Sequence, residues 1–83
     1  MNHQDIIIGK TILYFLKEQR VSKTYLASAL AISNGMLTNI LQGKNKLSLS
    51  RFLEVCKILK VSPTVFLNRM AKAKETINIG ISV

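Results

Sequence analysis

The sequence has few acidic residues. Its 83 residues contain four Asp and Glu against twelve Lys and Arg, which gives a net charge of +8. No acidic residue lies between Glu18 and Glu54, and the basic residues in that interval are Arg20, Lys23, Lys44, Lys46 and Arg51. Such an excess favours a polyanionic partner, either nucleic acid or an anionic membrane surface. A basic surface that is merely solvated is the simpler alternative.

Cysteine and histidine are also scarce. The single Cys56 excludes an internal disulfide and suits a reducing cytosol. The one histidine, His3, and the scattered carboxylates form no pair at catalytic or metal-ligand spacing, and no glycine-rich phosphate loop is present. We therefore expect no enzymatic activity, no metal and no cofactor.

Long hydrophobic runs are missing as well. No apolar stretch approaches the roughly 18 residues of a membrane span, and no basic segment precedes the apolar N-terminal residues, as it would in a secretory signal. We expect a soluble intracellular protein with one small domain. Its hydrophobic content of 48% is generous for so basic a chain, so part of it is expected at a subunit interface.

Apolar residues at helical spacing predict five helices. They cover residues 5–19, 22–30, 34–41, 51–60 and 63–70. Residues suited to capping the helix starts are Asp5, Ser22, Ser33, Ser48 or Ser50, and Ser62. Gly43 is placed to end the third helix in a left-handed conformation. The residues expected to face the core are Ile8, Ile12, Phe15, Leu16, Leu26, Ala27, Leu30, Leu37, Ile40, Phe52, Val55, Cys56, Leu59, Val65, Phe66 and Met70.

The last eight residues change period. Ile77, Ile79, Ile81 and Val83 alternate with small or polar residues, a pattern typical of a strand. Such a strand needs a partner, either residues 5–8 of the same chain or its own copy in a second subunit. We expect these four side chains to form a dimer interface; a disordered tail is the alternative.

Residues 22–44, SKTYLASALAISNGMLTNILQGK, place two short helices around a three-residue break. With Leu26 and Ala27 in the first helix, Ile32 at the turn, and Leu37 and Ile40 in the second, the sequence resembles the Cro/repressor-type (lambda-repressor-like) helix-turn-helix DNA-binding family. The resemblance extends over about residues 6–69, and VSPTVFL resembles the closing helix of that family. It implies an all-α, compact five-helix domain over residues 1–75, with the helix-turn-helix at 22–42 and a C-terminal dimerisation strand or tail at 76–83. Ala31 replaces a frequent glycine at the turn, which predicts a small local strain.

The resemblance also implies which side chains contact DNA. The second helix of the motif presents its N-terminal residues to base edges in the major groove, and here these are Ser33, Asn34, Gly35, Thr38 and Asn39. Asn pairs well with adenine and the Thr methyl with thymine, so an A/T-leaning site is expected. The residues expected to bind phosphates are Lys23, Thr24, Gln42, Lys44, Asn45, Lys46 and Arg51.

A family member of this kind implies a dimeric, sequence-specific transcriptional regulator, expected to repress from a palindromic operator. It would be a cytoplasmic, nucleoid-associated protein encoded by a bacterium, phage or plasmid. The same fold also serves antitoxins and other modules that bind a partner protein, and this is the principal alternative. Attachment to a membrane surface is less favoured, because the lysines lie in loops as well as on helices.

Overall fold

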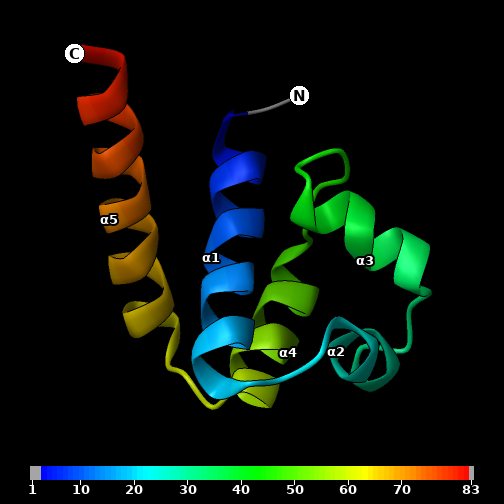
Figure 1. Cartoon of the computed structure of the whole chain (residues 1–83). Helices are drawn as coiled ribbons and strands as arrows, with labels where there is room; N and C mark the ends of the chain where they lie inside the picture. Colours follow the sequence, from blue (N-terminus) through cyan, green and yellow to red (C-terminus); the bar gives the residue numbers. More distant parts are fainter. Residues whose placement is uncertain (1–2, 83) are drawn as a thin grey trace.

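Five helices follow one another along the chain in the computed structural model, which describes the backbone of residues 3–82 and the side chains of residues 3–73 (Figure 1). They are α1 (His3–Gln19), α2 (Lys23–Ala29), α3 (Asn34–Leu41), α4 (Leu49–Leu59) and α5 (Pro63–Ser82). The all-α, five-helix prediction is confirmed. None of these helices, over the described residues, is both long enough and apolar enough to cross a bilayer.

Serine side chains cap the N-terminal ends of four of the helices. The Oγ atoms of Ser22, Ser33, Ser48 and Ser62 each accept a hydrogen bond from the backbone N–H three residues later, at 3.0–3.2 Å. Each bond satisfies one of the N–H groups that a helix start leaves without an intrahelical partner. The fourth helix is thus capped by Ser48 and not by Ser50. The prediction for Asp5 is wrong, because α1 begins at His3 and Asp5 lies in its first turn.

The first four helices end in the same way. A residue with positive φ follows or closes each helix: Arg20 (55°), Ala31 (57°), Gly43 (79°) and Lys60 (56°). The next residue then donates its amide N–H to the carbonyl five positions earlier, at 2.8–3.0 Å. This is the Schellman arrangement, which pairs carbonyls that a helix end would leave free. The predicted left-handed ending at Gly43 is confirmed.

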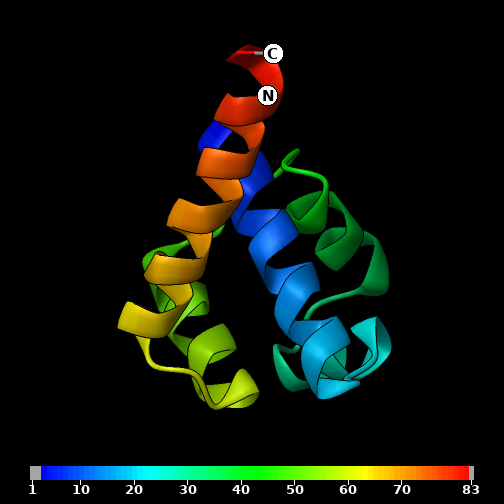
Figure 2. The same ribbon diagram turned by 60° about the vertical axis from the view of Figure 1, so that its left-hand side comes forward.

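The core lies around α1, which runs through the middle of the molecule and contacts α3, α4 and α5 (Figures 1 and 2). Aromatic rings join three of these helices, since Phe66 stacks on Phe15 at 5.7 Å and meets Phe52 edge-on at 5.0 Å between ring centroids. Most predicted core residues are buried, but Ile8, Phe52 and Met70 are only half-buried and Val65 is 48% exposed. Burial raises the pKa of the Cys56 thiol, which packs in this core as an apolar group.

The predicted C-terminal strand is wrong. Residues 76–82 continue α5 without a break, so Ile77, Ile79 and Ile81 lie in a helix (Figure 1); Val83 lies outside the described residues. A strand needs a neighbouring strand to satisfy its backbone groups, and the described part of the chain contains none. A helix satisfies these groups within the segment, and no proline interrupts the run that starts at Pro63.

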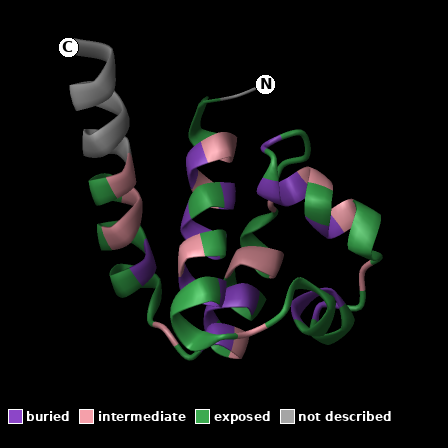
Figure 3. Cartoon of the chain, in the orientation of Figure 1, coloured by how far each residue is buried: buried purple, intermediate pink, exposed green. Residues whose placement is uncertain are grey.

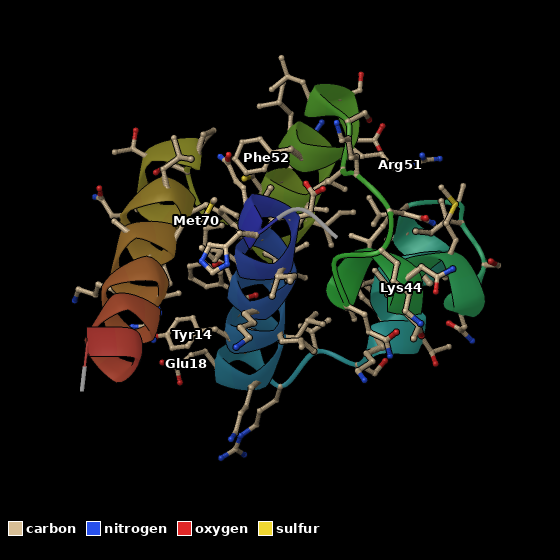
Figure 4. All side chains as sticks on the ribbon, turned by 90° about the horizontal axis from the view of Figure 1, so that it is seen from above. Tyr14, Glu18, Lys44, Arg51, Phe52 and Met70 are labelled. Atoms are coloured by element: carbon tan, nitrogen blue, oxygen red, sulfur yellow. The ribbon has the colours of Figure 1, made fainter. Side chains whose placement is uncertain are left out.

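A small polar cluster holds α5 against α1. The guanidinium of Arg69 lies 3.8 Å from the centroid of the Tyr14 ring, a cation–π contact. The Tyr14 hydroxyl in turn donates to Glu18 Oε1 at 3.3 Å. Tyr14 and Glu18 lie together on the side of α1 that faces α5 (Figure 4).

Candidate nucleic-acid interface

The two helices of the predicted motif, α2 and α3, pack on the core through one face each. The buried residues of these two helices and the turn after α2 are Leu26, Ala27, Leu30, Leu37, Ile40 and Leu41. Ala31 lies in the turn with a positive φ of 57°, which agrees with the local strain predicted from the sequence. For a residue other than glycine this conformation costs about 1–2 kcal/mol. The turn is held by the Ile32 amide, which donates to the Ala27 carbonyl at 3.0 Å.

The other face of α3 carries the residues predicted to read bases. Residues three and four positions apart share a helix face, so Asn34, Gly35, Thr38 and Asn39 form one surface. Asn34, Gly35 and Thr38 are exposed, whereas Asn39 is half-buried and therefore less accessible than predicted. The Ser33 Oγ already accepts the Met36 N–H at 3.0 Å, so this hydroxyl can offer a base only its remaining hydrogen-bonding capacity.

One group of predicted phosphate-binding residues continues from the C-terminal end of this surface. Gln42 forms the C-cap of α3, and Lys44, Asn45 and Lys46 follow in the loop to α4; all four are exposed. Arg51 lies in the first turn of α4 and is half-buried. Lys44 and Arg51 lie on the side of α1 away from α5 (Figure 4). Gln42, Lys44, Asn45 and Lys46 thus follow the C-terminal end of α3, whereas Arg51 lies on α4.

A second group lies at the start of α2. Lys23 and Thr24 are the first two residues of this helix, and both are exposed. The Ser22 Oγ takes up the N–H of Tyr25 at 3.0 Å. The Ser22 hydroxyl keeps its own O–H as a donor, and the Lys23 and Thr24 side chains add a positive charge and a second hydroxyl at this end of α2.

Comparison with known families identifies the domain. The profile of the Cro/C1-type HTH DNA-binding domain matches residues 11–75 of the chain, which include all five helices in part or whole. The chain belongs to the Cro/C1-type helix-turn-helix DNA-binding family. No curated protein sequence matches it at a significant level.

Solved structures share the fold of this Cro/C1-type domain. One structure of the clp gene regulator ClgR from Corynebacterium glutamicum has a TM-score of 0.80 at 23% identity, covering 88% of this chain and 95% of that one. A second structure of ClgR has a TM-score of 0.84 at 22% identity, covering 98% of this chain and 88% of that one. At this level of identity the likeness establishes the fold.

The Cro/C1-type domain has a repeated connector that sequence reasoning missed. Arg20-Val21-Ser22, Ala31-Ile32-Ser33 and Lys60-Val61-Ser62 each consist of a left-handed residue, a half-buried β-branched residue and a serine cap. The repeated triplet, any residue followed by Val or Ile and then Ser, is visible in the sequence. Three of its four occurrences lie at links between helices, and the fourth, Gly80-Ile81-Ser82, lies within α5. The three links place two cations, on Arg20 and Lys60, in left-handed positions.

Proposed function

We propose that this protein is a sequence-specific, double-stranded DNA-binding transcriptional regulator that acts as a repressor on a partly palindromic operator. The observation that carries the proposal is the exposed polar surface of α3, formed by Asn34, Gly35 and Thr38 on a helix whose other face is buried. Basic segments flank this surface on α2 and on the loop after α3, and residues 19–53 contain no acid. The structurally similar ClgR is a clp gene regulator, which supports the same role for this chain.

In this proposal α3 enters the major groove with its N-terminal end foremost. Asn34 and Asn39 would each form a bidentate pair with an adenine, and the Thr38 methyl would contact a thymine methyl. Gly35 leaves open space beside the helix, since a Cβ built there would have only Ser33 Oγ, at 4.0 Å, within reach. The DNA can then approach the backbone closely. The flanking lysines fix the position of the protein on the duplex without reading its sequence.

Selection of bound sequences from a random DNA pool, followed by footprinting, tests the proposal directly. We expect an A/T-leaning core site. Against the selected site, Asn39→Ala should cost about 1–3 kcal/mol and relax the preference at one base pair. Lys44→Ala, the matched phosphate-contact variant, should weaken binding to all sequences alike and lower the salt slope by about one. Equal weakening of every sequence by Asn39→Ala would contradict its base-reading role.

We also propose that the protein acts as a dimer, which would present two α3 helices about 34 Å apart, one turn of DNA. Apolar side chains exposed on α4 and α5 support an interface: Leu49 is 72%, Leu53 48% and Leu67 53% exposed. An open groove of about 370 Å³ lies next to them, lined mainly by apolar residues that include Phe52 and Met70. Burying such surface against a second copy would remove it from water.

Deletion of residues 76–83 tests the role of the end of α5 in this dimer. We expect the truncated chain to remain helical by circular dichroism, to sediment as a smaller species and to bind the operator more weakly. Unchanged sedimentation would show that these residues, and with them Ile77, Ile79, Ile81 and Val83, do not form the interface. A full chain that sediments as a monomer would instead favour a partner protein on the apolar groove, as in an antitoxin.

A further inference from the structure

A second basic site lies outside the set of residues predicted to contact DNA. An open hollow of about 490 Å³ lies where the α1–α2 connector, the start of α2 and the end of α4 meet. Its lining includes the cations Arg20 and Lys60, the hydroxyl-bearing Ser22 and Tyr25, and the apolar Ile58. Tyr25 is 60% exposed, so its hydroxyl is accessible. None of the residues lining this hollow is acidic.

A hydrogen bond ties together the two chain segments that carry the cations. The Gln19 side-chain amide donates to the Leu59 carbonyl and so ties the last residue of α1 to the last residue of α4. Arg20 and Lys60 are the next residues along the chain from the two ends of this bond. Glu18, the carboxylate nearest to Arg20 in sequence, accepts a hydrogen bond from Tyr14. Neither Glu18 nor Glu54, the carboxylate nearest to Lys60, lines the hollow. Two like charges are therefore brought to one hollow without a compensating acid, and a bound anion would relieve their repulsion.

The backbone at both cations adds to the case. Arg20 and Lys60 have φ of 55° and 56°, a conformation in which glycine carries no steric penalty. Cations also interact favourably with the C-terminal end of a helix, and this is the competing explanation for their presence. That explanation treats each helix end separately, whereas the structure brings both cations and two hydroxyl groups to the same hollow.

We propose that this hollow binds a phosphate group. Cationic side chains and hydroxyl donors are among the groups that bind phosphate in proteins. The phosphate could belong to the DNA backbone outside the segment covered by α3, in which case the inference rests on the proposed function. It could equally belong to a free phosphate compound, and the two sources are separated by experiment.

The DNA source is tested by the salt dependence of binding. The double variant Arg20→Gln/Lys60→Gln is compared with Lys17→Gln/Lys57→Gln, which removes the same charge one turn earlier on each helix at exposed positions that do not line the hollow. We expect the slope of log affinity against log salt concentration to become less steep by about 0.9 in the first variant. This is the change for one lost phosphate contact. The matched variant should change it much less.

A titration tests whether the ligand is a free phosphate compound. Inorganic pyrophosphate is added to the full chain, and binding is followed by backbone amide chemical shifts. Saturable shifts at residues 19–25 and 58–60 that vanish in the Arg20→Gln/Lys60→Gln variant support the proposal, even if the protein binds no DNA and the proposed function fails. Pyrophosphate binding with an unchanged DNA salt slope identifies a free phosphate compound as the ligand. No saturable shift together with equal salt slopes for the two double variants overturns the proposal.

Glycine variants separate binding from the structural role of the two cations. Arg20→Gly/Lys60→Gly removes the charges and also relieves the left-handed backbone, so we expect a higher thermal midpoint together with lost pyrophosphate binding. A lower midpoint with pyrophosphate binding intact would mean that the cations serve only the helix ends, and the proposal would be wrong.

Discussion

At its C-terminal end α3 is pressed against α1, whereas Gly35 near its N-terminal end faces open space. A Cβ built on Gly9 of α1 would overlap the carbonyl group of Leu41, and one built on Gly43 would lie 2.6 Å from Ile6 Cγ1. A Cβ on Gly35 would meet nothing closer than Ser33 Oγ at 4.0 Å. The burial pattern changes in the same direction, from buried positions near α1 to exposed ones at the outer end of α3 (Figure 3).

The turns at the two ends of α3 also differ in how crowded their left-handed residues are. Both contain a left-handed residue, but the one beside α1 is Gly43 and the exposed one is Ala31. Glycine is thus used where the left-handed backbone is also crowded by a neighbouring helix, and alanine where only the backbone is strained. Fixing α3 at one end leaves the other end free to contact DNA in the proposed function, and this division can be tested by substitution at each end.

Gly9→Ala should have the largest effect. The added methyl would run into backbone atoms of Leu41, which cannot move away as a flexible side chain can. We expect the free energy of unfolding, measured by urea denaturation, to fall by about 3 kcal/mol. Gly35→Ala is the matched control and should leave stability unchanged or raise it by up to about 1 kcal/mol, because alanine favours helix. Equal losses in the two variants would contradict the contrast between the ends.

Gly43→Ala should have the next largest effect. Its φ of 79° is unfavourable for alanine, and the methyl would also lie 2.9 Å from the backbone nitrogen of Ile6. We expect a loss of about 2 kcal/mol in the free energy of unfolding by the same measurement. A variant as stable as the wild type would show that α1 does not press on this turn in solution.

The features that could be predicted from the sequence are those set by local chemistry. Ser22, Ser33 and Ser62 cap helices because a serine hydroxyl can reach an N–H three residues later, whatever the rest of the fold does. The buried face of α3 follows from helical spacing alone. The proposed DNA-reading surface follows from that spacing together with the family resemblance.

The features that could not be predicted depend on how the folded chain packs around a residue or on the whole length of a helix. Gly9 weakens an isolated helix, and only its contact with Leu41 explains its place in α1. Asn39 is half-buried, and its carbonyl accepts the amides of Lys44 and Asn45 at 2.8 and 3.4 Å, so the loop folds back on it. The alternating isoleucines favour a strand only if a second strand is available, and α5 shows that helix continuation prevails in the described chain.

Ala31→Gly should have the smallest effect and the opposite sign. Glycine relieves the left-handed backbone at an exposed position where nothing crowds the turn, although the greater freedom of the unfolded chain offsets part of this gain. We expect the free energy of unfolding to rise by about 0.5–1 kcal/mol. Ala29→Gly, at the exposed last residue of α2, is the matched control and should lower it by up to about 1 kcal/mol. If both variants lower the free energy of unfolding, the turn before α3 is not strained. The difference between the two ends of α3 then rests on the crowding at Gly43 alone.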